Sequence, residues 1–115
     1  MTIQHLHAGP RMSRGVLHGD VVYLSGLVAD DTSLDVKGQT VQILAAIDAL
    51  LAEAGTDKSK LLKANIWLTD ITTWAQMNEA WDAWVVPGQT PARATVEAKL
   101  AGPGYKVEIM VEAAR

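Results

Sequence analysis

The chain has 115 residues, of which 49% are hydrophobic and 20% charged, and its formal net charge is −3. This length predicts one domain spanning residues 1–115, and the high apolar share excludes an intrinsically disordered chain. Uncharged runs are shorter than the roughly 18–20 residues that span a membrane, no export signal is evident, and the acidic balance argues against nucleic-acid partners. Cysteine is absent, as in many cytoplasmic proteins, so we expect a cytoplasmic location without disulfides.

The N-terminal half changes from β-prone to helical patterns. Residues 12–17 and 21–26 predict two strands, and the Gly19-Asp20 pair between them suits a tight hairpin turn. A further short strand is predicted over residues 2–6, and the polar residues 30–38 predict a loop. Apolar side chains recur at three- and four-residue spacing over residues 39–54, which predicts a helix that ends at Gly55.

The C-terminal half predicts strand, helix and two further strands. Residues 61–69 alternate between apolar and polar types, which is typical of a half-buried strand. A second helix follows, with a capping box from Thr73 and Gln76 at its start and Pro87-Gly88 at its end. Its apolar face is a stripe at helical spacing that we assign to the core: Trp74, Met77, Trp81 and Trp84. Residues 91–100 and 105–113 predict a terminal hairpin.

This element order predicts an α+β domain in which both helices pack on one face of a five- to six-stranded mixed sheet. The alternation in the last two strands predicts that Arg93 and Glu108 share the uncovered face, with Trp67 and Met110 beside them. Such a mixed face suits either solvent or a partly dry subunit interface. The excess of apolar residues in so small a domain favours partner chains.

Arg93 and Glu108 are the candidate site residues on this face. A guanidinium matches a carboxylate in bidentate geometry, and a neighbouring acid can hold or activate water. As a pair alone, the same two side chains also suit a structural salt bridge, which is the commoner case. No metal site is expected, because His5 and His7 alternate along a strand but lack a third ligand.

The motifs around these residues resemble a known family. Pro91-Ala92-Arg93-Ala94-Thr95-Val96-Glu97, followed after a Gly/Pro turn by Lys106-Val107-Glu108-Ile109, is similar to the C-terminal signature of the Rid proteins, also called YjgF/YER057c/UK114. Tyr23-Leu24-Ser25-Gly26 and Asn78 match further positions, so the resemblance covers essentially the whole chain. Residues 78–86 and 105–109 resemble the YoaB-like branch.

The resemblance implies a chorismate-mutase-like (YjgF-like) fold and a homotrimer with ligand clefts between subunits around a central barrel. The implied activity is hydrolysis of reactive 2-imino and enamine acids, such as 2-aminoacrylate and 2-iminopropanoate, to 2-oxo acids and ammonia. No cofactor is implied. By position, Arg93 corresponds to the arginine that grips the substrate carboxylate, and Glu108 to the acid that positions the attacking water. Gly26, Thr95 and Asn78 correspond to residues that line the cleft.

One position departs from the family pattern. Deaminases of this family commonly carry a tyrosine after Gly-Pro, whereas Arg11 follows Gly9-Pro10 here. A second arginine near the site favours a dianionic ligand, so Arg11 joins the candidate substrate-binding residues. The alternative function is a non-catalytic trimer that binds a small carboxylate or metabolite. Ribonuclease activity, also attributed to some relatives, is disfavoured by the acidic charge and the absence of a basic groove.

Overall fold

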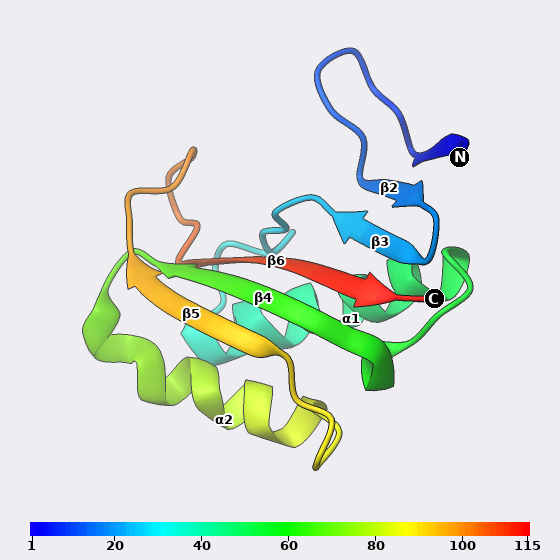
Figure 1. The fold of residues 1–115 in the computed structure, drawn as a ribbon. Coiled ribbons are helices and arrows are strands. Elements are labelled where there is room, and N and C mark those ends of the chain that lie inside the picture. Colours follow the sequence, from blue (N-terminus) through cyan, green and yellow to red (C-terminus); the bar gives the residue numbers. More distant parts are fainter.

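The computed structural model describes residues 1–115 and contains six strands and two α-helices. In chain order these are β1 (Ile3–Leu6), β2 (Gly15–His18), β3 (Val21–Leu24), α1 (Val36–Glu53), β4 (Leu61–Leu68), α2 (Trp74–Trp84), β5 (Ala92–Glu97) and β6 (Val107–Ala114). The strands form one sheet in the order β1-β2-β3-β6-β4-β5, and both helices lie on one of its faces (Figure 1). Only β4 and β5 run parallel, so the sheet is mixed. The predicted α+β architecture is confirmed.

The expected terminal hairpin is wrong. The strands β5 and β6 are not neighbours, because β4 lies between them and β6 occupies the middle of the sheet. The physical reason is that the two strands differ in how well they suit burial in the middle of the sheet. In β6, Val107, Ile109 and Val111 are completely buried, whereas β5 carries Arg93 and Glu97 and suits a sheet edge. The chain between them is long enough to cross over the end of β4.

The helix boundaries follow from local capping. Helix α1 begins at Val36 rather than at residue 39, because the Asp35 side chain accepts a hydrogen bond from the Gly38 backbone N–H at 2.8 Å. Gly55, with φ of +81°, follows the end of the helix as predicted. The predicted capping box before α2 is wrong: Thr73 makes no side-chain cap, and its hydroxyl donates instead to the Asp70 carbonyl at 2.6 Å.

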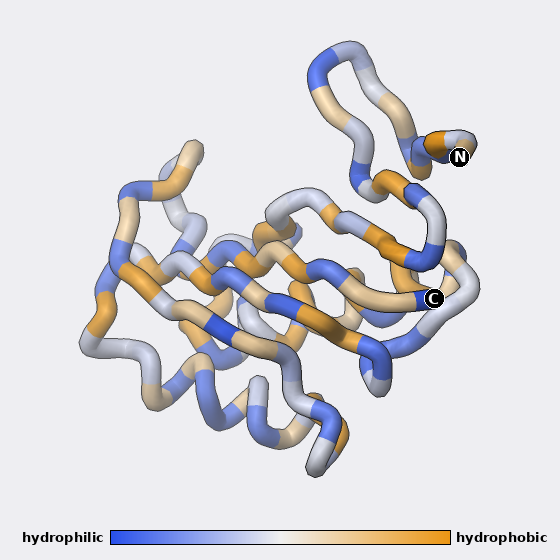
Figure 2. The backbone as a smooth tube through the Cα atoms, viewed as in Figure 1, coloured by the Kyte–Doolittle hydropathy of each residue, from blue (hydrophilic) through white to orange (hydrophobic).

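The core lies between the helices and the inner face of the sheet, and apolar and polar residues alternate along the central strands (Figure 2). Trp81 and Trp84 belong to it, with ring centroids 5.5 Å apart. Trp74 does not, because it starts α2 and its side chain is 53% exposed. Three of the four predicted stripe residues are therefore buried. No helix of the fold has the length and hydropathy needed to cross a membrane.

Gln39 joins two loops to the start of β6. Its buried side-chain amide donates to the carbonyls of Leu34 and Gly104, at 3.1 and 2.9 Å, and accepts from the Lys106 backbone N–H at 2.9 Å. The Lys106 ammonium donates to the Leu34 carbonyl at 2.8 Å. Both the backbone and the side chain of Lys106 therefore serve this junction.

Candidate functional site

The sheet register places the two candidate residues on opposite faces. Arg93 pairs with Ala64, a fully buried residue of the inner face, so the Arg93 side chain lies on the helix side. Glu108 pairs with Trp67, and both lie on the uncovered face. The expectation that Arg93 and Glu108 are neighbours on one face is therefore wrong. It failed because the prediction took the apolar positions of β5 as the buried ones, whereas β5 is an edge strand whose polar residues Arg93 and Thr95 lie on the helix side.

The guanidinium of Arg93 is held by two residues of α2. Its Nη1 donates to Asn78 Oδ1 at 2.7 Å, and its Cζ lies 5.4 Å from the centre of the Trp81 ring. The two ion pairs of the chain, His7–Glu53 and Lys37–Glu79, do not involve Arg93. Since a guanidinium has five N–H donors, most of those of Arg93 stay free. The result is an exposed, oriented cation without an internal counter-charge.

Thr95 follows Arg93 on the same face of β5. It pairs with the buried Ile66 of β4. Its hydroxyl is buried and has no hydrogen-bond partner in the chain, which is unusual for a buried polar group. Arg93, Thr95 and Asn78 therefore lie together at the β5 edge of the molecule. A shallow pocket of about 240 Å³ lies between the start of β5 and the facing stretch of β4, lined by Lys63, Ala64, Asn65, Ala92, Arg93 and Ala94.

Glu108 lies against Gly26 on the uncovered face. A Cβ atom at Gly26 would collide with the Glu108 carboxylate, so this close approach requires glycine. Glu108 is half-buried, and its side-chain carboxylate forms no hydrogen bond or ion pair within the chain. Partial burial raises the pKa of the Glu108 carboxyl, because the charged form loses hydration. The sequence-predicted residues Gly26 and Glu108 are thus brought together.

A bulge brings Gly26 to this position. Tyr23 pairs with Glu112, and Leu27 pairs with Ile109. The stretch from Tyr23 to Leu27 therefore contains one residue more than the stretch of β6 that it faces. The extra residue bends the stretch between Tyr23 and Leu27, and bulges often lie next to functional sites. The Ser25 hydroxyl inside the bulge is buried without a partner. Gly26 and the bulge therefore form a second cluster, in which the Ser25 hydroxyl has no hydrogen-bond partner and Gly26 lies in close contact with Glu108.

A pocket of about 390 Å³ adjoins the bulge, with walls from the bulge and from the loop between β1 and β2. It is lined by His7, Met12, Arg14, Ser25, Gly26, Leu27, Val28 and Asp30. Arg11 belongs to the same loop but is exposed and does not line this pocket. Sequence reasoning gave no role to Arg14, which lies in no motif, or to Ser25, which lies in the Tyr23–Gly26 match but was not singled out within it. It also assigned Trp81 only to the core, although Trp81 follows Asn78 by one helical turn.

The two clusters lie at separated parts of the molecule. The Arg93 cluster is at the β5 edge and on the helix side, whereas the Gly26–Glu108 cluster is on the uncovered face, and β4 separates the strands β5 and β6 (Figure 1). Within one chain, Arg93 and Glu108 cannot act on the same small molecule.

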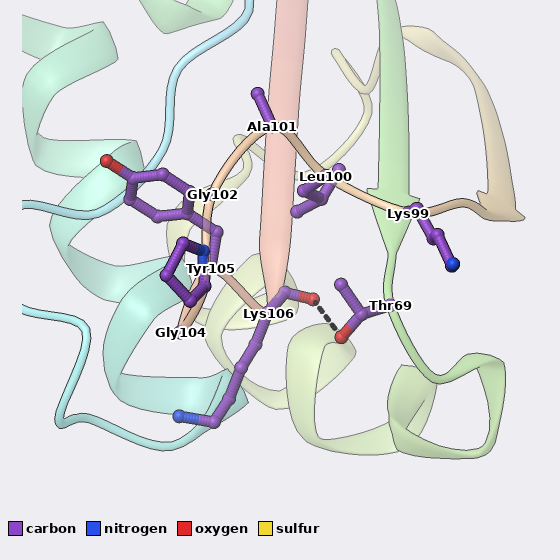
Figure 3. A pocket seen from close by; sticks show the side chains of 9 residues that line it. Thr69, Lys99, Leu100, Ala101, Gly102, Gly104, Tyr105 and Lys106 are labelled. Atoms are coloured by element: carbon purple, nitrogen blue, oxygen red, sulfur yellow. Dashed lines mark hydrogen bonds between the residues drawn. The ribbon is translucent and has the colours of Figure 1, made fainter.

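Other surface features do not join either cluster. A pocket of about 580 Å³ beneath residues 99–106 contains none of the predicted site residues, and the side chains of Lys99 and Lys106 point away from each other (Figure 3). His5 contacts the Ser13 hydroxyl at 3.2 Å, while His7 contacts Glu53 of α1 at 2.8 Å. The two histidines therefore have different partners, and no group of three metal-ligating side chains is present.

Comparison with known proteins identifies the family. A family model described as Endoribonuclease L-PSP matches residues 2–115. The RutC family protein YoaB of Escherichia coli is 46% identical over 114 residues, which cover 99% of both chains. A YjgF-family protein of Neisseria meningitidis has a solved structure with a TM-score of 0.97 and 44% identity, covering 100% of this chain and 96% of that one. The chain belongs to the YjgF/Rid family. The expected YoaB-like character agrees with the full-length match to YoaB.

More distant members have the same fold. The structure of a YjgF/YER057c/UK114 protein from Mycobacterium tuberculosis superposes with a TM-score of 0.90 at 26% identity, covering 99% of this chain and 100% of that chain. The YjgF-like fold predicted from the sequence is thereby confirmed.

Proposed function

We propose that the protein hydrolyses reactive 2-imino and enamine acids, of the 2-aminoacrylate and 2-iminopropanoate type, to 2-oxo acids and ammonia. The site is shared between copies of the chain: one copy supplies Arg93, Thr95 and Asn78, and its neighbour supplies Gly26 and Glu108. The observation that carries the proposal is the placement of Arg93 and Glu108 on opposite faces, each without an intramolecular charged partner.

Arg93 is the carboxylate-binding group of this site. Its free N–H donors match a carboxylate in bidentate geometry. Thr95 lies two residues further along the same face of β5 and flanks the bound carboxylate. The reacting imine carbon is adjacent to the substrate carboxylate, so anchoring the carboxylate also fixes the carbon to be attacked.

Glu108 is the acid–base group. Its carboxylate holds a water molecule against the imine carbon and accepts a proton as the water oxygen forms the new C–O bond. The nitrogen reacts as the protonated iminium, which an enamine acid reaches by taking up a proton at C3, so water addition gives a neutral carbinolamine. The protonated carboxyl then gives its proton to the amino nitrogen. As the C–N bond breaks, the hydroxyl oxygen forms the C=O bond and passes its own proton to the Glu108 carboxylate, which releases ammonia and leaves the 2-oxo acid. The raised pKa of Glu108 suits both transfers, because it brings the group closer to neutral pH.

The Arg93 cluster and the Gly26–Glu108 cluster are the two half-sites of this shared site. They also specify how copies of the chain associate. A contact between the Arg93 surface of one copy and the Glu108 surface of the next is head-to-tail, and head-to-tail contacts form a ring when the rotation between copies closes. We propose that this ring is the homotrimer implied by the family resemblance. Exposed apolar side chains on the uncovered face support burial there: Tyr23 at 40%, Val96 at 49% and Met110 at 37% exposure.

Complementation between inactive variants tests the shared site. A dehydratase generates 2-aminoacrylate, and its decay is followed with Arg93→Ala protein, with Glu108→Gln protein, and with both after mixed refolding. Each variant alone is expected to be inactive. In a one-to-one mixture, about a quarter of the interfaces combine an intact Arg93 with an intact Glu108, so about a quarter of parental activity returns. Activity in either single variant, or no recovery in mixed oligomers, contradicts the proposal.

Carboxylate binding without turnover is the second candidate, favoured by Arg11 at a position where deaminases of the family commonly have tyrosine. Calorimetry with 2-oxo acids and dicarboxylates separates the two functions: saturable binding without acceleration of 2-aminoacrylate decay supports the second. Because the matching family model is described as an endoribonuclease, RNA is included as a substrate. Cleavage of RNA that is lost in Arg93→Ala protein would favour ribonuclease activity over both.

A further inference from the structure

We propose that Trp81 is a positioning residue that orients Arg93 for an incoming carboxylate. This inference rests on the proposed function, because the ligand of Arg93 is taken to be the substrate carboxylate. It assigns a role in recognition to a side chain whose helical spacing alone indicates only a core position.

The two contacts of the guanidinium restrict it in different directions. The Trp81 ring lies 5.4 Å from Arg93 Cζ and contacts the guanidinium as a cation–π partner. Asn78 Oδ1 accepts from Nη1 at 2.7 Å and holds one edge of the group. Asn78 and Trp81 are one helical turn apart on α2, so the same rigid element provides both contacts. An exposed arginine would otherwise lose considerable rotamer freedom on binding a ligand.

Trp81 is itself firmly held. It is 5% exposed and packs at 5.5 Å from Trp84, whose indole N–H donates to both carboxylate oxygens of Asp48 at 3.1 Å. The Lys58 ammonium also lies over the Trp84 ring, 5.3 Å from the ring centre. Helix α1, through Asp48, therefore fixes the pair of indoles on α2, and this pair supports Arg93. The orientation of the guanidinium is built into the helix layer.

The chemistry of the two contacts explains why they suit an anion site. A carboxylate partner would orient Arg93 but would also neutralise it and compete with the ligand. An indole ring and a neutral amide orient the guanidinium and leave its full charge available. The structure has this arrangement, because neither ion pair of the chain includes Arg93.

Binding of pyruvate, measured by calorimetry, tests the role of Trp81 independently of catalysis. Trp81→Leu removes the aromatic face, and we expect its dissociation constant to rise between about twofold and fivefold, whereas Trp81→Phe shows a smaller rise. Trp74→Phe is the matched control, since it changes the exposed indole at the start of α2, which belongs neither to the core nor to the support of Arg93, and its affinity should equal that of the parent. Circular dichroism and light scattering confirm that each variant is folded and assembled.

Fluorescence provides a signature that a purely structural role would not give. Propanoate, which does not absorb in the near ultraviolet, neutralises Arg93 and should change the emission of the adjacent Trp81. The change should persist in Trp74→Phe protein and vanish in Trp81→Phe protein. Parental pyruvate affinity in Trp81→Leu protein, or an unaltered fluorescence response in Trp81→Phe protein, overturns the inference. If the parent binds pyruvate but does not deaminate 2-aminoacrylate, only the proposed function fails. If the parent does not bind pyruvate, both fail.

Discussion

Arg93 and Glu108 extend from opposite faces of the same sheet, and the whole of β4 separates the strands that carry them. Each is a charged group without an ion-pair partner in its own chain. The relation excludes the simplest interpretation of the two residues, an internal salt bridge. It is the arrangement expected when each residue is one half of a site that a second copy completes.

Replacing Arg93 by alanine should remove carboxylate binding with little effect on folding. Charge-assisted hydrogen bonds to the ligand are lost, so pyruvate affinity should fall at least roughly tenfold. Arg93 is exposed, so the free energy of unfolding should change by less than about 1 kcal/mol. Calorimetry and urea unfolding measure the two effects. Arg115→Ala, which removes another exposed arginine, is the control and should leave pyruvate affinity unchanged.

Glu108→Gln should abolish deamination and stabilise the fold at neutral pH. Because burial raises the pKa of Glu108 in the folded chain, the folded state holds the proton more tightly than the unfolded state. The free energy of unfolding of the parent therefore falls as pH rises from the unfolded pKa through the folded one. Glutamine carries no charge and escapes this loss, so the Tm of the variant should exceed that of the parent at neutral pH but not below the unfolded pKa. Equal Tm differences at both pH values would contradict the burial of Glu108.

The activity of the parent should show the complementary pH dependence. A water-holding carboxylate must be ionised, so the rate of 2-aminoacrylate decay should fall as pH drops through the raised pKa of Glu108. The rate is measured over the uncatalysed reaction at each pH. A rate enhancement that persists well below the ordinary pKa of a glutamic acid would assign the proton transfer to another group.

Gly26→Ala should disturb the site through a steric effect on Glu108. The new Cβ would overlap the carboxylate, and relief of such overpacking typically costs about 1–3 kcal/mol of unfolding free energy. The double variant Gly26→Ala/Glu108→Ala removes the overlap, so its stability should return toward that of Glu108→Ala alone. Thermal unfolding of the four proteins checks this coupling. Additive effects would show that Gly26 and Glu108 are not in contact.

Met110→Asp should weaken association between copies. Met110 lies on the uncovered face next to Asn65 and is 37% exposed in the single chain. Burying an unpaired carboxylate in an interface is strongly unfavourable, so light scattering should show a lower mass and deamination should be lost with it. Val41→Asp introduces the same charge at a 53% exposed position on α1 and should leave the mass unchanged.

Much of the fold was predictable because local signals dominate it. The Gly19-Asp20 turn, the apolar spacing of α1 and the alternation of β4 each specify an element from neighbouring residues. The pairing of β5 was not predictable in this way. The last two strands follow each other in the sequence, yet β5 pairs with β4, in parallel and after a helical crossover. This pairing joins distant parts of the chain, and it depends on which of the last two strands has a face that can be buried.

The site was predictable in identity but not in geometry. Pro91-Ala92-Arg93 and the segment containing Glu108 are conspicuous as motifs, and the contact between Arg93 and Asn78 lies among the predicted residues. Alternation along β6 predicted the face of Glu108 correctly. It assigned Arg93 to the wrong face, because β5 is an edge strand whose polar residues Arg93 and Thr95 lie on the helix side. Trp81 was assigned to the core, which is correct, but periodicity cannot reveal that one edge of a buried ring also supports a guanidinium.

The separation of the two half-sites has a consequence for how the protein responds to its own concentration. A chain that has dissociated from its neighbours contains every residue of the site and yet no complete site. Dilution should therefore lower activity per chain once the protein falls below its dissociation constant, and a 2-oxo acid bound across the interface should oppose this loss by mass action. The amount of protein, and not only the amount of substrate, would then set the rate per molecule.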